Sequence, residues 1–191
     1  MKDRVAEILD AVLKEGRTML LEPEAKRVCN EYGIRTPPFR VVTRLDDGLN
    51  AARYLGFPVV LKAVCPDITH KTEAGCVITD LKSAGEVRHA FSKIIKNARQ
   101  HAPQSRMHGV IVEKMTAPGV EVIIGGIRDE QFGPAIMFGL GGILVEVFED
   151  TAFRVVPVRE LDARRMIREI KGYRILKGYR RLPAVDEAGL V

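Results

Sequence analysis

The chain has 191 residues, of which 46% are hydrophobic, and a net charge of +5. That length allows one hydrophobic core, or two small lobes that share a cleft. The chain has no tryptophan and only 6% aromatic residues, which argues against a nucleic-acid site built on base stacking. The three cysteines, Cys29, Cys65 and Cys76, lack CxxC spacing, so a zinc site is not expected. Their odd number suits a reducing compartment, and we expect the protein in the cytoplasm.

The sequence also argues against a membrane protein. No run reaches about 18 consecutive apolar residues. The first segment, MKDRVAEILDAVLKEG, carries charges throughout and predicts an amphipathic helix rather than a signal peptide. The basic stretch at 164–181 favours a solvated helical face or a site for a small anion over a nucleic-acid tail.

The first half of the chain alternates predicted helices and strands. Pro23 and Gly33 suit the start and the end of the second helix, and Ser83 with Glu86 forms a possible capping box before the fourth. Apolar residues elsewhere recur at helical or strand spacing. The predicted helices cover 2–15, 22–33, 45–56 and 83–100, and the predicted strands cover 39–43 and 58–64.

From residue 109 the pattern changes to short apolar runs separated by glycine or proline, which is typical of strands and turns. The runs cover 109–115, 119–127, 133–140, 143–148 and 153–158, and a helix is predicted over 160–170. This order favours two α+β lobes over a doubly wound parallel sheet. We expect an N-terminal helix in 1–20, a first lobe in 21–107 and a second lobe in 108–191.

A lysine interrupts the apolar strand PVVLKAV. Lysine almost never stays fully buried without a partner. Lys62 is therefore either a strand-end residue whose amine reaches water, or an ammonium that binds phosphate in a cleft.

The loop PDITHKTEAG follows that strand. Its small residues before Gly75 allow backbone N–H groups to wrap an anion. His70 can accept a phosphoryl group there, with Lys62 and Lys71 offsetting the charge. A single loop histidine is more often an ordinary surface residue, so the pattern alone leaves both interpretations open.

Two acids flank a Pro-Gly turn in VIVEKMTAPGVEVIIG. Glu113 and Glu121 can bind ribose hydroxyls while the backbone at Lys114 and Met115 meets an adenine edge. The spacing alone favours a hairpin with exposed acids. Further on, the glycine turn at 139–142 precedes Glu146, Asp150 and Arg154.

That glycine turn has neither GxGxxG nor P-loop spacing, which excludes a Rossmann or P-loop site. Glycine turns between strands are usually structural, although acids and an arginine beside one also suit a metal–phosphate cleft.

Several long segments occur together in one order: LLEPEAKRVCNEYGIRTPPFRVV, FPVVLKAVCPDITHKTEAG, VIVEKMTAPGVEVIIGGIRDEQFGPAIMFGLGGILVEVFEDTAFRVVPV and IREIKGYRILKGYR. Over about residues 16–182 they resemble the ATP-grasp domain of the β subunit of ADP-forming acyl-CoA (acetyl-CoA) synthetases. The similarity to the succinyl-CoA synthetase β subunit is more distant. The resemblance implies an ATP-grasp fold of the α+β class, with ATP or ADP held between two lobes.

The resemblance also implies roles for particular residues. Lys62 is expected to contact the nucleotide phosphates. His70 is expected to relay the phosphoryl group between a histidine of an α subunit and ADP, whereas His89, His101 and His108 should tolerate replacement. The expected nucleotide-binding set is completed by Lys71, Gly75, Glu113, Lys114, Met115, Thr116, Glu121 and Arg154.

The implied reaction converts acyl-CoA, ADP and phosphate to acid, CoA and ATP, reversibly. An α subunit is expected to carry the CoA site and the first phosphohistidine, so the chain alone should be inactive. Two departures from the family pattern matter. Cys76 replaces the second glycine of a Gly-Gly pair, where a side chain would narrow the approach to phosphate. The chain also stops at PAVDEAGLV, before the family's last strand with its Mg²⁺-binding acid, so the Mg²⁺ ligands are not predicted.

Two other functions remain open. The chain can be a truncated nucleotide-binding module, regulatory or assembling, without turnover. A ligase that joins an acid to an amine is a weaker alternative, because it would not require His70.

Overall fold

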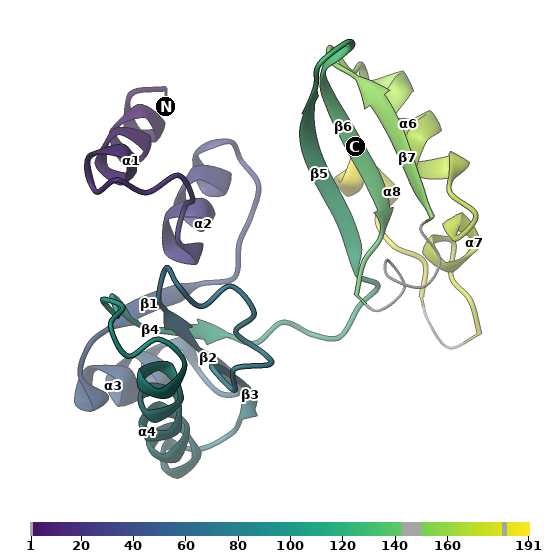
Figure 1. Cartoon of the computed structure of the whole chain (residues 1–191). Coiled ribbons are helices and arrows are strands. Elements are labelled where there is room, and N and C mark those ends of the chain that lie inside the picture. The colour runs from purple at the N-terminus through teal and green to yellow at the C-terminus, as the bar shows by residue number, and fades with distance from the viewer. Residues whose placement is uncertain (1, 143–149, 181–182) are drawn as a thin grey trace. The chain divides into compact units, whose positions relative to one another are not determined.

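A computed structural model describes residues 2–142, 150–180 and 183–191. The chain divides into two compact units, Met1–Thr116 and Ala117–Val191. Each unit contains an antiparallel sheet and helices (Figure 1), which confirms the predicted α+β class. Among the described residues, none of the helices combines the length and the apolar character that a membrane crossing requires.

The N-terminal unit contains the four predicted helices. Its helices are α1 (Lys2–Lys14), α2 (Glu22–Glu31), α3 (Leu45–Leu55) and α4 (Ala84–His101), and its strands are β1 (Phe39–Val42), β2 (Val59–Val64), β3 (Val77–Leu81) and β4 (Gly109–Lys114). Ser83 caps α4, since Ser83 Oγ accepts a hydrogen bond from the Glu86 N–H, but Glu86 Oε2 accepts from the Lys82 N–H rather than from the Ser83 N–H, so the predicted capping box is only half formed. α3 and α4 pack together against the sheet (Figure 1), and their apolar faces close the first core.

The strand order in the N-terminal sheet is β1-β4-β2-β3, and every neighbouring pair is antiparallel. β4 therefore lies at the centre of this sheet, although its sequence was expected to open the second lobe at residue 108. The reason is that Gly109–Glu113 is buried between β1 and β2, and β4 pairs with both of these strands although they lie far from it along the chain. The observed boundary between the units follows Thr116. β3 was not predicted.

The C-terminal unit contains a three-stranded sheet in the order β5-β6-β7. Its elements are β5 (Val122–Asp129), β6 (Gly133–Leu140), β7 (Thr151–Val155), α6 (Glu160–Glu169), α7 (Tyr173–Leu176) and α8 (Glu187–Leu190). Phe138 and Ala152 on one face of the sheet pack in a second core with Met166 and Ile167 of α6. The strand predicted over 143–148, with Glu146, lies outside the described residues.

Candidate functional site

Lys62 is the half-buried position of a strand whose other residues are buried. β2 pairs on both sides, with Lys62 opposite Ile111 of β4 and Val77 of β3. Its ammonium reaches Glu22 Oε1 of α2 at 2.7 Å, and its side chain is 21% exposed. The strand lysine therefore has a carboxylate partner and still reaches solvent.

Two further charges complete what we call the Lys62 cluster: Glu22, Lys26, Lys62 and Glu113. Glu113 Oε2 lies 2.5 Å from Lys26 Nζ and 3.5 Å from Lys62 Nζ, and Lys26 lies 3.5 Å from Glu22. The Glu113 side chain is only 8% exposed, so it is the innermost member. Positive and negative groups alternate, which offsets the cost of burying each charge.

The pKa of the Glu22 carboxyl shows which influence dominates at the outer side of the cluster. Burial raises this pKa, but the hydrogen bond and charge of Lys62 oppose it, as do the charges of Lys26 and Lys71. The pKa of Glu22 consequently lies below its ordinary value. Glu22 is thus a stable carboxylate among three lysines.

The histidine loop, residues 66–75, is fastened at its C-terminal end. The Cys76 N–H donates to Lys71 O at 2.7 Å, and Asn97 Nδ2 of α4 donates to Gly75 O at 2.8 Å. Gly75 has a φ of +61°, and a Cβ there would lie 2.6 Å from Asn97 Nδ2, so this position requires glycine. The Cys76 side chain is fully buried in the first core. The expectation that it narrows the approach to the loop was wrong, because the thiol points inward.

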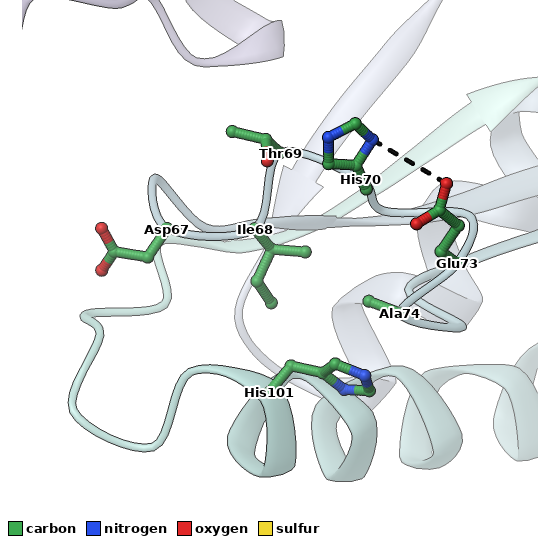
Figure 2. Close-up of a pocket in the computed structure, with 7 residues that line it drawn as sticks. All are labelled: Asp67, Ile68, Thr69, His70, Glu73, Ala74 and His101. Carbon is green, nitrogen blue, oxygen red and sulfur yellow. Dashed lines mark ion pairs between the residues drawn. The ribbon is translucent and has the colours of Figure 1, made fainter.

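His70 itself is held loosely. Its side chain is 79% exposed, and its Nδ1 lies 3.9 Å from Glu73 Oε1. Figure 2 shows these two side chains turned toward each other on one side of a pocket of about 300 Å³, with His101 of α4 on the other. Asp67 and Thr69 also line this pocket. Nothing in the local sequence pattern predicted that His101 borders the same pocket as His70.

A second cavity, also about 300 Å³, joins the Lys62 cluster to the histidine loop. One wall is the segment 16–22, which ends at Glu22, and the other comes from residues 65–71, including Thr69 and Lys71. Glu22 thus belongs both to the cluster and to the wall that faces the loop. The N-terminal unit brings Lys62 and Lys71 close to one carboxylate, Glu22, that the sequence reasoning missed.

The residues at the end of β4 already donate hydrogen bonds within the N-terminal unit. Lys114 Nζ donates to the carbonyls of Gly56 and Phe57, at 2.8 and 2.9 Å. The N–H groups of Lys114 and Met115 donate to Pro38 O and Pro58 O. An adenine edge at this backbone would meet N–H groups that already have partners. Thr116 is the last residue of the N-terminal unit.

Glu121 and Arg154 lie in the C-terminal unit. Gly142 has a φ of +61°, and a Cβ there would lie 2.6 Å from Glu121 Oε2, so the glycine turn gives room to this carboxylate. Arg154 pairs with Glu169 of α6. Asp150 accepts hydrogen bonds from two backbone N–H groups, of residues 171 and 172, at 2.8 and 2.6 Å. These contacts give Asp150 a structural role at the start of α7. Within residues 2–142, 150–180 and 183–191, no group of three His, Cys, Asp or Glu side chains is arranged to hold a metal ion.

Glu22 and Lys26 are the functional candidates that sequence reasoning missed. Their i, i+4 spacing in EPEAK places them on one face of α2, which is the arrangement of a helical ion pair. That spacing alone does not reveal contacts with β2 and β4, because those partners lie 40 and 87 residues away along the chain.

Comparison with known proteins agrees with this architecture. Residues 11–191 match the model of a family described as an ATP-grasp domain. The chain is 44% identical over 191 residues to subunit beta of acetate–CoA ligase [ADP-forming] II from Pyrococcus furiosus, covering 100% of this chain and 81% of that subunit. It is similar to the acetyl-coenzyme A synthetase 1 of Ca. Korarchaeum cryptofilum, solved with coenzyme A and Ca-AMPCP: the TM-score is 0.93 and the identity 43%, over 96% of this chain and 80% of that one.

A second structure of the Korarchaeum enzyme is also similar to this chain. It contains coenzyme A and Mg-AMPPCP, and its phosphohistidine segment points towards the nucleotide-binding site. Its TM-score is 0.83 and its identity 42%, over 97% of this chain and 80% of that chain. The chain therefore belongs to the ATP-grasp family, in the group that includes the beta subunits of ADP-forming acetate–CoA ligases.

Proposed function

We propose that this chain is the nucleotide-binding subunit of an ADP-forming acyl-CoA synthetase. It would transfer a phosphoryl group between His70 and ADP while the complete enzyme converts acyl-CoA, ADP and phosphate to acid, CoA and ATP. One observation carries the proposal: in a chain of this family, an ammonium fixed by a carboxylate, Lys62, is followed eight residues later by an exposed histidine, His70. The reaction is reversible, so the same residues serve ATP synthesis and its reverse.

The residues of the N-terminal unit fit nucleotide phosphates. Lys62 and Lys71 both place positive charge near Glu22, and Glu22 and Lys71 line the cavity that reaches the histidine loop. Gly75 allows the loop's tight turn. We propose that Lys62 and Lys71 bind phosphate oxygens as charge-assisted donors. Glu113 and Thr116, which lie in the same unit, are proposed for the nucleotide's other groups.

The transfer step uses one ring nitrogen of His70. Nδ1 faces Glu73, so Nε2 is the nitrogen directed away from that carboxylate. In the direction of ATP use, the Nε2 lone pair attacks the γ-phosphorus, a P–N bond forms, and the bond from phosphorus to the bridging oxygen breaks. ADP leaves with that electron pair. In the direction of ATP synthesis, a β-phosphate oxygen of ADP attacks the phosphohistidine and returns the electron pair to Nε2.

An α partner is part of the proposal. We propose that it carries the CoA site and exchanges the phosphoryl group with His70, because this chain shows no second histidine on its own loop. Mg²⁺ would arrive on the nucleotide phosphates, as is usual for Mg²⁺, which binds one or two carboxylates plus substrate phosphates. The three cysteines are free thiols, which fits the cytoplasmic location that we propose.

Phosphohistidine labelling tests the proposal. The chain is incubated with γ-labelled ATP, Mg²⁺ and a co-purified α partner, and acid-labile, base-stable label is measured. We expect label on the wild-type chain and none on His70→Asn, with ADP affinity nearly unchanged. His89→Asn is the matched control, since His89 lies on exposed α4 surface with its Nδ1 bonded to Gly85 O. Full labelling of His70→Asn would remove the relay role, and nucleotide binding with no label on the wild type would favour the non-catalytic module.

A further inference from the structure

The shortest contact of the Lys62 ammonium is to an anionic oxygen, Glu22 Oε1, at 2.7 Å. We propose that Glu22 is a stand-in for the nucleotide phosphate: it holds Lys62 while no nucleotide is bound and gives up this contact when a nucleoside di- or triphosphate binds. This inference rests on the proposed role of Lys62 in nucleotide binding, and it adds a residue for which the family resemblance implied no role.

The depth of the cluster indicates which carboxylate yields. Lys62 Nζ has a short contact to Glu22, 2.7 Å, and a longer one to Glu113, 3.5 Å. The Glu22 side chain is 23% exposed, whereas that of Glu113 is 8% exposed and is held by Lys26 at 2.5 Å. An anion that arrives from solvent meets the outer carboxylate first. Glu113 therefore keeps Lys62 in place while Glu22 is exchanged for phosphate.

The displaced carboxylate has other cations nearby, which lowers the cost of the exchange. Lys26 Nζ lies 3.5 Å from Glu22 Oε1. Lys71 lines the same cavity as Glu22, and its charge already acts on the Glu22 carboxyl. Because a half-buried carboxylate without a partner would be costly, these two lysines make the exchange feasible.

The exchange requires only a side-chain rotation, because the start of α2 is fixed. Arg17 binds both carboxylate oxygens of Glu24 with two hydrogen bonds, at 2.9 and 2.6 Å. Glu24 also accepts the Leu21 N–H at 2.6 Å. This bidentate contact anchors the first helical turn of α2. Glu22, two residues before Glu24, points to Lys62 instead. The helix can therefore stay in place when Glu22 turns away.

The stand-in role has an unusual consequence: removing the charge of Glu22 should strengthen nucleotide binding. Glu22→Gln in the full chain should bind ADP roughly two- to fivefold more tightly by calorimetric titration, the range expected for losing one partly exposed competing ion pair. Pyrophosphate, which has no adenosine, should gain by the same factor. Adenosine, which has no phosphate, should bind as it does to the wild type.

Glu31→Gln is the matched control. It removes the same charge from the same helix, its side chain is 25% exposed, and its partner is Arg4. We expect no change in ADP affinity, which separates the local effect from net charge. When Lys62→Ala is also present, Glu22→Gln should not increase the ADP affinity, since the lysine that Glu22 would otherwise hold is absent. Thermal melts of each variant establish that it is folded.

Glu22→Asp keeps the charge but shortens the side chain, so it should give a smaller gain than Glu22→Gln. If ADP binds Glu22→Gln as it binds the wild type, or more weakly, while Lys62→Ala loses affinity, then Lys62 binds nucleotide but Glu22 is not its stand-in. If Lys62→Ala leaves the ADP affinity unchanged, the nucleotide role of Lys62 fails, and the stand-in role fails with it.

Discussion

The Lys62 cluster and the histidine loop hold their polar groups in opposite ways, although His70 follows Lys62 by only eight residues. Each side chain of the cluster is at least three-quarters buried and faces an opposite charge. His70 and Glu73 are 79% and 83% exposed, with 3.9 Å between them. Buried pairs keep their geometry because separating them leaves an uncompensated charge, whereas exposed pairs contribute about 1 kcal/mol or less. The molecule thus fixes the cation and leaves the proposed nucleophile, His70, exposed.

The most direct way to break this contrast is to remove the innermost charge. Glu113→Gln leaves Lys26 facing a neutral amide at a buried position, and we expect it to lower the free energy of unfolding by on the order of 3 kcal/mol. Chemical denaturation of the N-terminal unit measures this loss. Glu169→Gln is the control, because its pair with Arg154 is 56% exposed on the glutamate side and should contribute under about 1 kcal/mol. Equal losses would mean that burial does not distinguish the two pairs.

The next largest effect concerns binding rather than stability. Lys62→Ala removes the proposed charge-assisted phosphate contact and should weaken ADP binding by about 1.5–3 kcal/mol, roughly 10- to 150-fold. Calorimetric titration gives the affinity, and thermal melts show whether the fold is kept. An unchanged affinity would make Lys62 a structural member of its cluster only.

These contrasts also show what the sequence reveals. Local signals predicted α4 with its Ser83 cap, the glycine end of α3 at Gly56, and the apolar strand around Lys62, because caps, turns and periodicity act over a few residues. The central place of β4 and the contact from Lys26 to Glu113 span many residues, so no local pattern reveals them. The sequence left Asp150 open between a structural turn and a metal–phosphate cleft for the same reason: its backbone partners lie 21 and 22 residues away.

The fastening of the histidine loop offers a smaller test. Gly75→Ala forces a side chain into a left-handed position and against Asn97, so we expect a loss of about 1–2 kcal/mol in the free energy of unfolding. In an Asn97→Ala background the steric conflict is absent, and the added cost of Gly75→Ala should fall to about 1 kcal/mol. Denaturation of the wild type, the two single variants and the double variant measures this coupling. Strict additivity would mean that Asn97 does not confine the end of the loop.

The smallest expected effect is a pH dependence that isolates Glu22. Burial raises the pKa of its carboxyl, but the hydrogen bond and charge of Lys62 outweigh burial with the help of Lys26 and Lys71, so the folded-state pKa lies below the unfolded one. A group with a depressed folded pKa stabilises the folded state above its unfolded pKa, about 4.3 for glutamate, and loses that contribution as the pH falls through the folded value. Glu22→Gln lacks this contribution at every pH.

The difference in melting temperature between the wild type and Glu22→Gln should therefore be largest near pH 6 and shrink as the pH is lowered below about 4.3. The corresponding free energy should stay within about 1 kcal/mol, because Glu22 is the outer member of the cluster. Subtracting the two profiles removes the carboxylates that both proteins share. A difference that grows on acidification would mean that the carboxylate of Glu22 is unfavourable in the folded protein, and the ion pair with Lys62 would then not be what holds it.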